Sequence, residues 1–211
     1  MIDTLIWLVA LPLTAAIATL LMPRLATMIA IGTGIGTSVV AGVLIYSVAT
    51  QGALHYEIGG WTAGLGIAVR VDGLSALLLL MTALVLLAAS VYSSAYFSAA
   101  LERNRFWPLW LLLWTSLNAL LLSGDLFNLY VTLELLGMSA VALAALSGKH
   151  AAVEAALRYL LVGLLGSMMF LAGVSLIYAG YGTLDLAALK LVVEPGPVAW
   201  TALALMTAGL L

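Results

Sequence analysis

The sequence predicts an all-α integral membrane protein, a multi-helix bundle, and three observations lead to this fold class. Hydrophobic residues make up 65% of the chain, and its mean hydropathy is +1.22. Charged residues make up only 8%, whereas a soluble domain carries about 25% because its surface must be solvated. Apolar segments recur along all 211 residues, and about 20 helical residues cross a bilayer core of about 30 Å. Lipid must therefore be the outer solvent of most of this chain.

The same composition argues against several functions. A formal net charge of −2 leaves no basic surface for nucleic acid. The absence of cysteine excludes disulfides, iron–sulfur ligation and thiol catalysis. The two histidines, His55 and His150, are far apart in sequence, and no nucleotide fingerprint or catalytic Ser/His/Asp set is present. We therefore expect no metal site, no cofactor and no active site of its own in this chain.

Charges and Pro/Gly clusters divide the chain into seven predicted helices. They span residues 4–22, 27–50, 72–92, 106–122, 126–146, 151–178 and 198–211. The first ends at Pro23, and Asp72 and Asp125, residues suited to cap helix N-termini, stand at the start of the third and just before the fifth. The seventh has about 14 residues, too few to cross a bilayer. We therefore expect residues 1–211 to form a single, truncated membrane domain whose last helix is incomplete and continues past Leu211.

The connections between these helices have patterns of their own. Residues 51–71 alternate around Gly59-Gly60 and Gly64-Leu65-Gly66, which predicts a short β-hairpin after the second helix. Residues 102–105 read as a charged connection before the fourth helix. Residues 184–193 have the pattern of a short amphipathic helix at the membrane interface.

Small and polar residues inside the helices predict close packing. Gly32 and Gly36 have G-x-x-x-G spacing in the second helix; because no strand precedes them and no Lys follows, we interpret them as packing residues. Thr115, Ser116 and Asn118 in the fourth helix could line a hydrated path, but interhelical hydrogen bonding is the role we favour.

Basic residues predict the orientation of the chain in the membrane. The loops on one side hold most of them: Arg24, Arg103, Arg105 and Lys149. Arg158 lies just inside the helix that adjoins these loops, and the opposite side holds Arg70 and Lys190. The bias places the first set in the cytoplasm. The N-terminus and the hairpin would then lie outside, with the chain in the cell inner membrane.

Glu134 is the strongest candidate for chemistry. It follows Leu126 by eight residues, which places it about 12 Å into the fifth helix and close to the bilayer midplane. A carboxylate at that depth costs a few kcal/mol unless it is neutralised, paired or hydrated. Such a group is suited to take up and release protons. The alternative is a protonated acid that only joins two helices by a hydrogen bond.

Arg158 is the second candidate. It follows Glu154 at i+4 on the sixth helix, so the two side chains can pair. A short turn joins the fifth and sixth helices, which predicts antiparallel neighbours and a difference in depth of about 6 Å between Glu134 and Arg158. Arg158 is then either an interfacial anchor or a basic partner that tunes the proton affinity of Glu134.

Three runs of sequence resemble one known family. They read GDLFNLYVTLE at 124–134, AAVEAALRYLLVG at 151–163 and YGTLDLAAL at 181–189. They resemble the proton-conducting antiporter-like family, which includes Mrp-type Na⁺/H⁺ antiporter subunits and the large membrane subunits of complex I and of membrane-bound hydrogenases. Residues 59–85 are similar to the external hairpin and third helix of the D-type subunits of Mrp antiporters.

This resemblance implies that the chain is the N-terminal portion, the first half, of an antiporter-like fold with inverted repeats. Glu134 matches the proton-carrying glutamate of the family's fifth helix. Arg158 stands where relatives often carry a Lys before a Tyr. Because arginine does not readily release a proton, Arg158 would tune Glu134 rather than relay protons. The family's essential lysine and its second repeat would lie beyond Leu211.

Two functions of different classes follow. The first is a proton-translocating membrane subunit of a multisubunit cation/proton antiporter or of a complex I-like NADH:quinone oxidoreductase or hydrogenase. Its partners would be other membrane subunits of a hetero-oligomeric complex, the lipid bilayer and protons, with Na⁺ left open. The second is a non-conducting structural or assembly subunit of such a complex. A lipid-modifying enzyme would need a clustered catalytic set, and the sequence has none.

Overall fold

The chain is a bundle of α-helices in a computed structural model that describes residues 2–58, 67–97 and 100–211. Helix accounts for 84% of it, which confirms the predicted fold class. The helices are α1 Ile2–Leu21, α2 Ala26–Gln51, α3 Gly73–Tyr96, α4 Ala100–Leu122, α5 Leu126–Ala144, α6 His150–Tyr181, α7 Leu186–Val192 and α8 Pro197–Leu210. A 3-10 turn, Pro23–Leu25, separates α1 from α2, and the strands are β1 Leu54–Glu57 and β2 Ala68–Val71.

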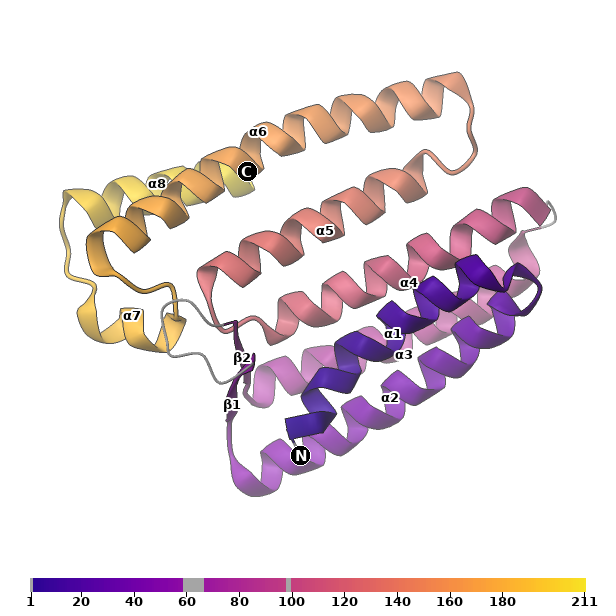
Figure 1. Cartoon of the computed structure of the whole chain (residues 1–211), viewed down its shortest axis with the longest axis horizontal. Coiled ribbons are helices and arrows are strands. Elements are labelled where there is room, and N and C mark those ends of the chain that lie inside the picture. The colour runs from indigo at the N-terminus through magenta and orange to yellow at the C-terminus, as the bar shows by residue number, and fades with distance from the viewer. Residues whose placement is uncertain (1, 59–66, 98–99) are drawn as a thin grey trace.

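The long helices lie side by side with their axes in a common direction (Figure 1). Helix α4 lies between two groups, because α1 packs on one side of it and α5 on the other. Helices α1, α2 and α3 pack together, and the row continues from α4 through α5 and α6 to α8. The two strands and α7 lie together at one end of the bundle.

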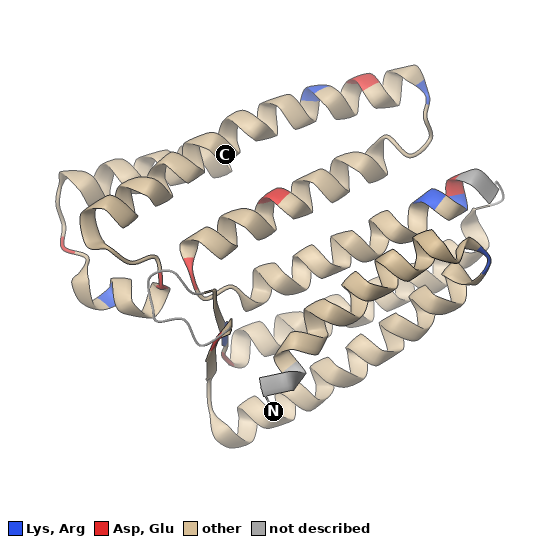
Figure 2. Ribbon diagram, in the orientation of Figure 1, with Lys and Arg blue, Asp and Glu red and all other residues tan. Residues whose placement is uncertain are grey.

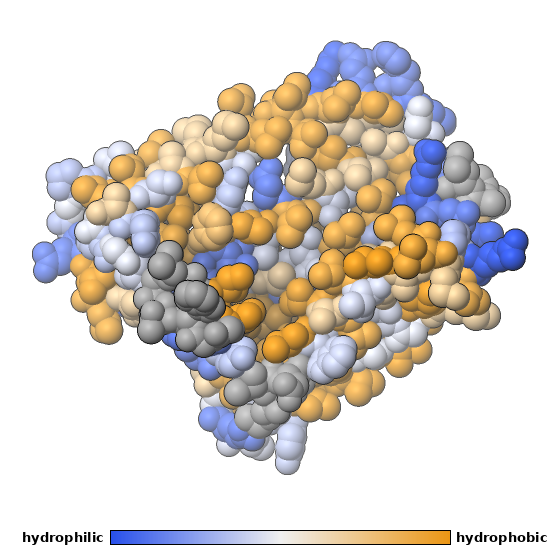
Figure 3. All heavy atoms as spheres, in the orientation of Figure 1, coloured by the Kyte–Doolittle hydropathy of each residue, from blue (hydrophilic) through white to orange (hydrophobic). Residues whose placement is uncertain are grey.

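The outer surface is apolar, as lipid contact requires. Helices α3, α5, α6 and α2 with its preceding turn are long and apolar enough to cross a membrane. Large apolar side chains cover the outside, among them Met28, Val85 and Val162, whose exposed fractions are 75%, 63% and 70%. Figure 3 shows this apolar surface between polar ends. Charged residues gather near the helix ends in Figure 2, apart from one acidic residue in the middle of α5.

Helix ends differ from the predicted ones where a helix leaves the lipid. Residues 102–105, predicted as a connection, belong to the first turns of α4, and α3 continues to Tyr96. Charged and polar residues such as Glu and Arg are good helix formers, so hydropathy marks the lipid-buried part of a helix and not its end. Helix α6 runs on to Tyr181 and ends at Gly182, whose φ of +68° gives a left-handed C-cap.

The predicted β-hairpin strands are present. Strands β1 and β2 pair antiparallel with Leu54 opposite Val71 and Glu57 opposite Ala68. The predicted turn glycines, Gly59 to Gly66, lie outside the described residues. The predicted amphipathic segment contains α7, which Asp185 caps by accepting the Ala188 amide proton at 2.7 Å.

The close helix contact in α2 is at Gly34 and not at the predicted Gly32 and Gly36. A Cβ on Gly34 would lie 2.9 Å from Leu87 and 3.1 Å from the Trp114 ring, which needs that space. Among the described residues, nothing lies within 4 Å of such an atom on Gly32, and Gly36 has only an ordinary contact with Leu11. The G-x-x-x-G pattern identified the right segment but the wrong face of the helix.

Asn118 has the predicted interhelical role. Its side-chain Nδ2 donates to the Leu8 carbonyl oxygen at 2.7 Å and so joins α4 to α1. A second interhelical bond runs from Trp110 Nε1 to Ser90 Oγ at 2.8 Å, between α4 and α3. Many other Ser and Thr hydroxyl groups in the helices bond back to a carbonyl of their own helix; Thr115 and Ser116 are examples.

A buried carboxylate, that of Asp125, ties the hairpin to α5. Its Oδ1 accepts the Asn128 amide proton at 2.7 Å, as an N-cap, and its Oδ2 accepts the Ala68 amide proton of β2 at 3.0 Å. The neighbouring Gly124 donates its own amide to the Ala68 carbonyl at 2.8 Å. A Cβ on Gly124 would lie 3.0 Å from that same oxygen, so a larger residue would press on the contact.

The same turn also holds the start of α7. Asp125 and Asp185 form an antiparallel bridge. The Leu126 amide donates to the Leu184 carbonyl and the Leu186 amide to the Gly124 carbonyl, each at 3.0 Å. Strand β2, α5 and α7 therefore meet at one hydrogen-bonded junction, which we call the Asp125 junction.

Asp125→Asn is expected to destabilise the protein by about 1–3 kcal/mol, because an amide supplies one acceptor oxygen for two buried N–H donors. Asp185→Asn is the matched control. Asp185 is also a buried N-cap, but among the described residues its carboxylate accepts one backbone amide, and asparagine caps as well as aspartate. Thermal unfolding in detergent micelles measures both variants. Equal losses would contradict this account of the junction.

A pH-dependent cap is expected at the start of α3. The pKa of Asp72 lies below its ordinary value of 3.8, chiefly because the Ser75 amide donates to the carboxylate. The stabilisation is therefore fully present above the ordinary pKa and is lost as the pH falls through the lower folded value. Hydrogen-exchange protection of the Ser75 amide should decline in that acid range. Asp72→Asn, whose cap does not titrate, should show no such decline.

Candidate functional site

Glu134 is the acidic residue in the middle of α5. It follows Asp125 by nine residues, about 13 Å along the helix axis, and no other residue of α5 is charged. Its side chain is half-buried, and within the described residues it has no hydrogen bond and no ion pair. A carboxyl group without a protein partner in the middle of a membrane-crossing helix is unusual, because an isolated charge is costly there.

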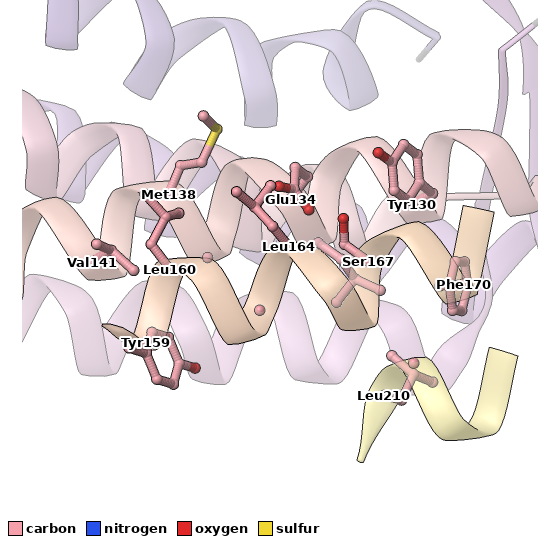
Figure 4. A pocket seen from close by; sticks show the side chains of 14 residues that line it. Tyr130, Glu134, Met138, Val141, Tyr159, Leu160, Leu164, Ser167, Phe170 and Leu210 are labelled. Atoms are coloured by element: carbon pink, nitrogen blue, oxygen red, sulfur yellow. The ribbon is translucent and has the colours of Figure 1, made fainter. Parts of the chain in front are cut away.

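Glu134 lines a cavity of about 180 Å³ between α5 and α6, with the end of α8 as a third wall. Figure 4 shows the side chains that surround it. Its polar members are Tyr130 and Glu134 of α5 and Tyr159 and Ser167 of α6, and the rest of the lining is apolar. The cavity can therefore hold a carboxyl group with a small amount of water.

Helical spacing explains which residues line this cavity. Tyr130, Glu134 and Met138 are spaced four residues apart and so share one face of α5. The facing glycines Gly137 and Gly163 make the space, because nothing lies within 4 Å of a Cβ on either one. At the hairpin end, the Tyr130 ring stacks on Phe170 of α6 with centroids 6.4 Å apart.

Arg158 lies on a different face of α6 from the cavity. Its guanidinium donates to Glu154 Oε1, as the i+4 spacing predicted, and its side chain is 77% exposed. His150 Nδ1 lies 3.9 Å from the other oxygen of Glu154. The neighbouring Tyr159 lines the cavity and Arg158 does not, because successive helical residues point about 100° apart. The structure brings Arg158 to Glu154, and its influence on Glu134 stays a prediction.

Sequence reasoning did not find Tyr130 and Ser167. Tyr130 carried a usable signal, because it precedes Glu134 by one helical turn on the same face. Ser167 carried none. Its place opposite α5 depends on the packing register of two helices, which an apolar sequence leaves open.

Glycines of α6 allow α8 to pack closely against it and form the third wall of the cavity. A Cβ on Gly166 would lie 2.7 Å from the Gly209 carbonyl oxygen, and one on Gly173 would lie 2.8 Å from the Ala202 carbonyl oxygen. Small residues let two helix backbones approach in this way. The backbone contact between α6 and α8 places Gly209 and Leu210 at the cavity.

Comparison with known proteins relates the chain to a family of membrane subunits. The family model "NADH:quinone oxidoreductase/Mrp antiporter, TM" matches residues 123–211. The chain is 38% identical over 161 residues to the N-type subunit of NADH-quinone oxidoreductase from Desulforudis audaxviator, covering 74% of this chain and 32% of that protein. It is 34% identical over 152 residues to the D-type subunit of the Na⁺/H⁺ antiporter from Bacillus subtilis, covering 72% and 31%.

The fold also matches solved structures. A chain of the membrane-bound sulfane sulfur reductase, an archaeal respiratory membrane complex, superposes with a TM-score of 0.91 and 29% identity, covering 98% of this chain and 44% of that one. The chain spans about a third of the length of the curated relatives it matches. The matched part includes Glu134 and the three helices that wall its cavity, since residues 123–211 contain α5, α6 and α8.

Gly166→Ala is expected to destabilise the protein by about 1–3 kcal/mol, because the new methyl group would force α6 and α8 apart. Gly163→Ala is the control on the same helix. A Cβ there meets nothing within 4 Å, and alanine favours helix by about 1 kcal/mol. Unfolding in detergent should therefore show a loss for Gly166→Ala and none for Gly163→Ala. A loss of equal size in both variants would contradict the close contact.

Proposed function

The chain belongs to the NADH:quinone oxidoreductase/Mrp antiporter transmembrane family, and from this premise we propose that it forms part of a proton-translocating membrane subunit in which Glu134 carries the proton. One observation supports this above the others. Glu134 is the one charged residue type in a helix apolar enough to cross a membrane, lies in the middle of that helix and borders a cavity with few polar groups. Intramembrane carboxyl groups in such surroundings mark ion and proton pathways.

In this proposal Glu134 alternates between the protonated and the ionised form. The cavity gives the carboxyl group room for water and so lowers the cost of the ionised form. The apolar remainder of the lining keeps that cost high enough for the proton to return. A charge that approaches or leaves Glu134 would shift the balance between its protonated and ionised forms. Such a shift can couple proton movement to a conformational change that moves the charge.

Arg158 would supply one such charge. Its guanidinium is bound to Glu154, and both side chains lie in the exposed first turns of α6. When that pair opens, Arg158 would act on the proton affinity of Glu134 through its charge, because it does not readily release a proton. This role requires the ion pair between Arg158 and Glu154 to open.

The partners would be other membrane subunits of a hetero-oligomeric complex. The relatives are subunits of a Na⁺/H⁺ antiporter and of an NADH-quinone oxidoreductase. We propose an assembly of that general kind in the cell inner membrane, with the N-terminus outside, as the basic residues of the loops indicate. The driving reaction would belong to partner subunits.

Glu134→Gln in the complete, assembled complex is expected to lower proton flux at least tenfold, because an amide cannot exchange a proton near neutral pH. Flux is measured in inverted membrane vesicles with a pH-sensitive dye, at matched abundance of the complex. Glu102→Gln is the control, since Glu102 lies in the first turn of α4 at the polar end of the bundle. Full flux in Glu134→Gln would favour the structural or assembly role instead.

A further inference from the structure

Ser167 has a hydroxyl group that its own helix does not use. It lies on α6, half-buried, and lines the Glu134 cavity. Ser139 of α5 and Ser175 of α6 each donate to the carbonyl four residues earlier, at 2.8 Å, the usual bond of a helical serine. Among the described residues Ser167 makes no such bond. Its donor and its acceptor are therefore both available to the cavity.

The Ser167 hydroxyl lies on the hairpin side of Glu134. In Figure 4 its oxygen projects from α6 toward α5, in the interval between the labelled Glu134 and Tyr130. The stacking of Tyr130 on Phe170 sets this register, since Phe170 is one turn beyond Ser167 on α6. No direct hydrogen bond joins Ser167 to Glu134 among the described residues, so a partner between them must be small.

A water molecule fits the space between Ser167 and Glu134. The cavity of about 180 Å³ far exceeds the roughly 10–15 Å³ that a single water needs, and a buried water takes two to four polar partners. Glu134 and Ser167 supply two such groups, and the rest of the lining is apolar apart from Tyr130 and Tyr159. Water in this cavity would gather beside the carboxyl group.

We propose that Ser167 holds a water molecule against the Glu134 carboxyl group and is a positioning residue of the proton path; this rests on the role proposed above for Glu134. When Glu134 is ionised, the water donates to the carboxylate and accepts from the serine hydroxyl. When Glu134 releases a proton, the oxygen of this water takes it and the water passes one of its own protons to the oxygen of a neighbouring water in the cavity, which carries the positive charge away. Ser167 keeps its hydroxyl proton throughout, and no charge stays on the water.

Few other ionisable groups compete for this position. Tyr130 and Tyr159 are the other titratable residues in the described lining. The charged pair of Glu154 and Arg158 lies on another face of α6. The charged residues of α4 are in its first two turns, 102–105, and α8 carries none. A water held by Ser167 is then the main hydrogen-bond donor to the ionised carboxyl group.

Ser167→Ala tests the proposal in the assembled complex, by proton flux in inverted vesicles across a range of pH. We expect about a tenfold loss at neutral pH and a rise of about one unit in the pH of half-maximal flux, because the ionised carboxylate loses its donor. Ser167→Thr, which keeps a hydroxyl, should retain most of the flux. Ser175→Ala is the control, since Ser175 is exposed on the same helix and bonds to Leu171.

A spectroscopic measurement separates this proposal from the proposed function. Infrared difference spectra should show a protonated carboxyl band that Glu134→Gln abolishes and that Ser167→Ala shifts in frequency. If Glu134→Gln stops flux while Ser167→Ala keeps the wild-type pH profile and band, the water site is wrong and the role of Glu134 stands. If Glu134→Gln leaves flux intact, both fail. An equal effect of Ser175→Ala would overturn the assignment to Ser167.

Discussion

The Asp125 junction is the constraint on which the part of the bundle around Glu134 depends. One buried carboxylate accepts an amide proton from its own helix and another from β2, and the backbone around it also binds the segment that leads into α7. A carboxylate can satisfy both donors because each of its oxygens is an acceptor. The start of α5 is thereby fixed along its axis and in rotation. The depth of Glu134 and the face on which it lies follow from that start, nine residues earlier.

The lipid environment explains why Glu134 stands apart. Backbone groups inside a bilayer must be satisfied within the protein, and several polar side chains of this bundle are satisfied in the same way, although the buried Thr37 hydroxyl and the indole N–H groups of Trp107 and Trp114 have no partner among the described residues. Asn118 uses its donor on the Leu8 carbonyl, and Thr132 and Ser139 of α5 bond to carbonyls of their own helix. Glu134 and Ser167 lie on neighbouring helices and line the same cavity. Within the described part of the chain, neither side chain bonds to its own helix or to another one. Two polar groups without protein partners beside one cavity indicate a place where something other than protein completes the hydrogen bonds.

The sequence predicts the helices and the caps because these depend on local chemistry. Asp72 and Asp125 cap helices as their residue type suggests, and Glu154 pairs with Arg158 because four residues make one turn. Features that depend on register are different. The bond from Ala68 to Asp125 joins residues 57 apart in sequence, the close contact of α2 falls on Gly34, and Ser167 meets α5 through helix packing. An apolar pattern is nearly the same on every face of such helices, so it cannot specify which residues meet.

The polar groups of the cavity are distributed unevenly about Glu134, so the hairpin side and the turn side of the site differ in polarity. Toward the hairpin end lie Tyr130, Ser167 and then the Asp125 junction. Toward the turn between α5 and α6, the space between these helices is lined largely by Ala, Val, Leu and Met side chains. Asn128 and Thr132 do not extend the polar side, because their groups bond to Ser123 and to the α5 backbone. In the described lining, Tyr130 and Ser167 are the polar residues on the hairpin side of Glu134, and Tyr159 is the polar residue among apolar side chains on the turn side. If Glu134 carries a proton as proposed, the hydroxyl of Ser167 would favour an approach of that proton from the hairpin end.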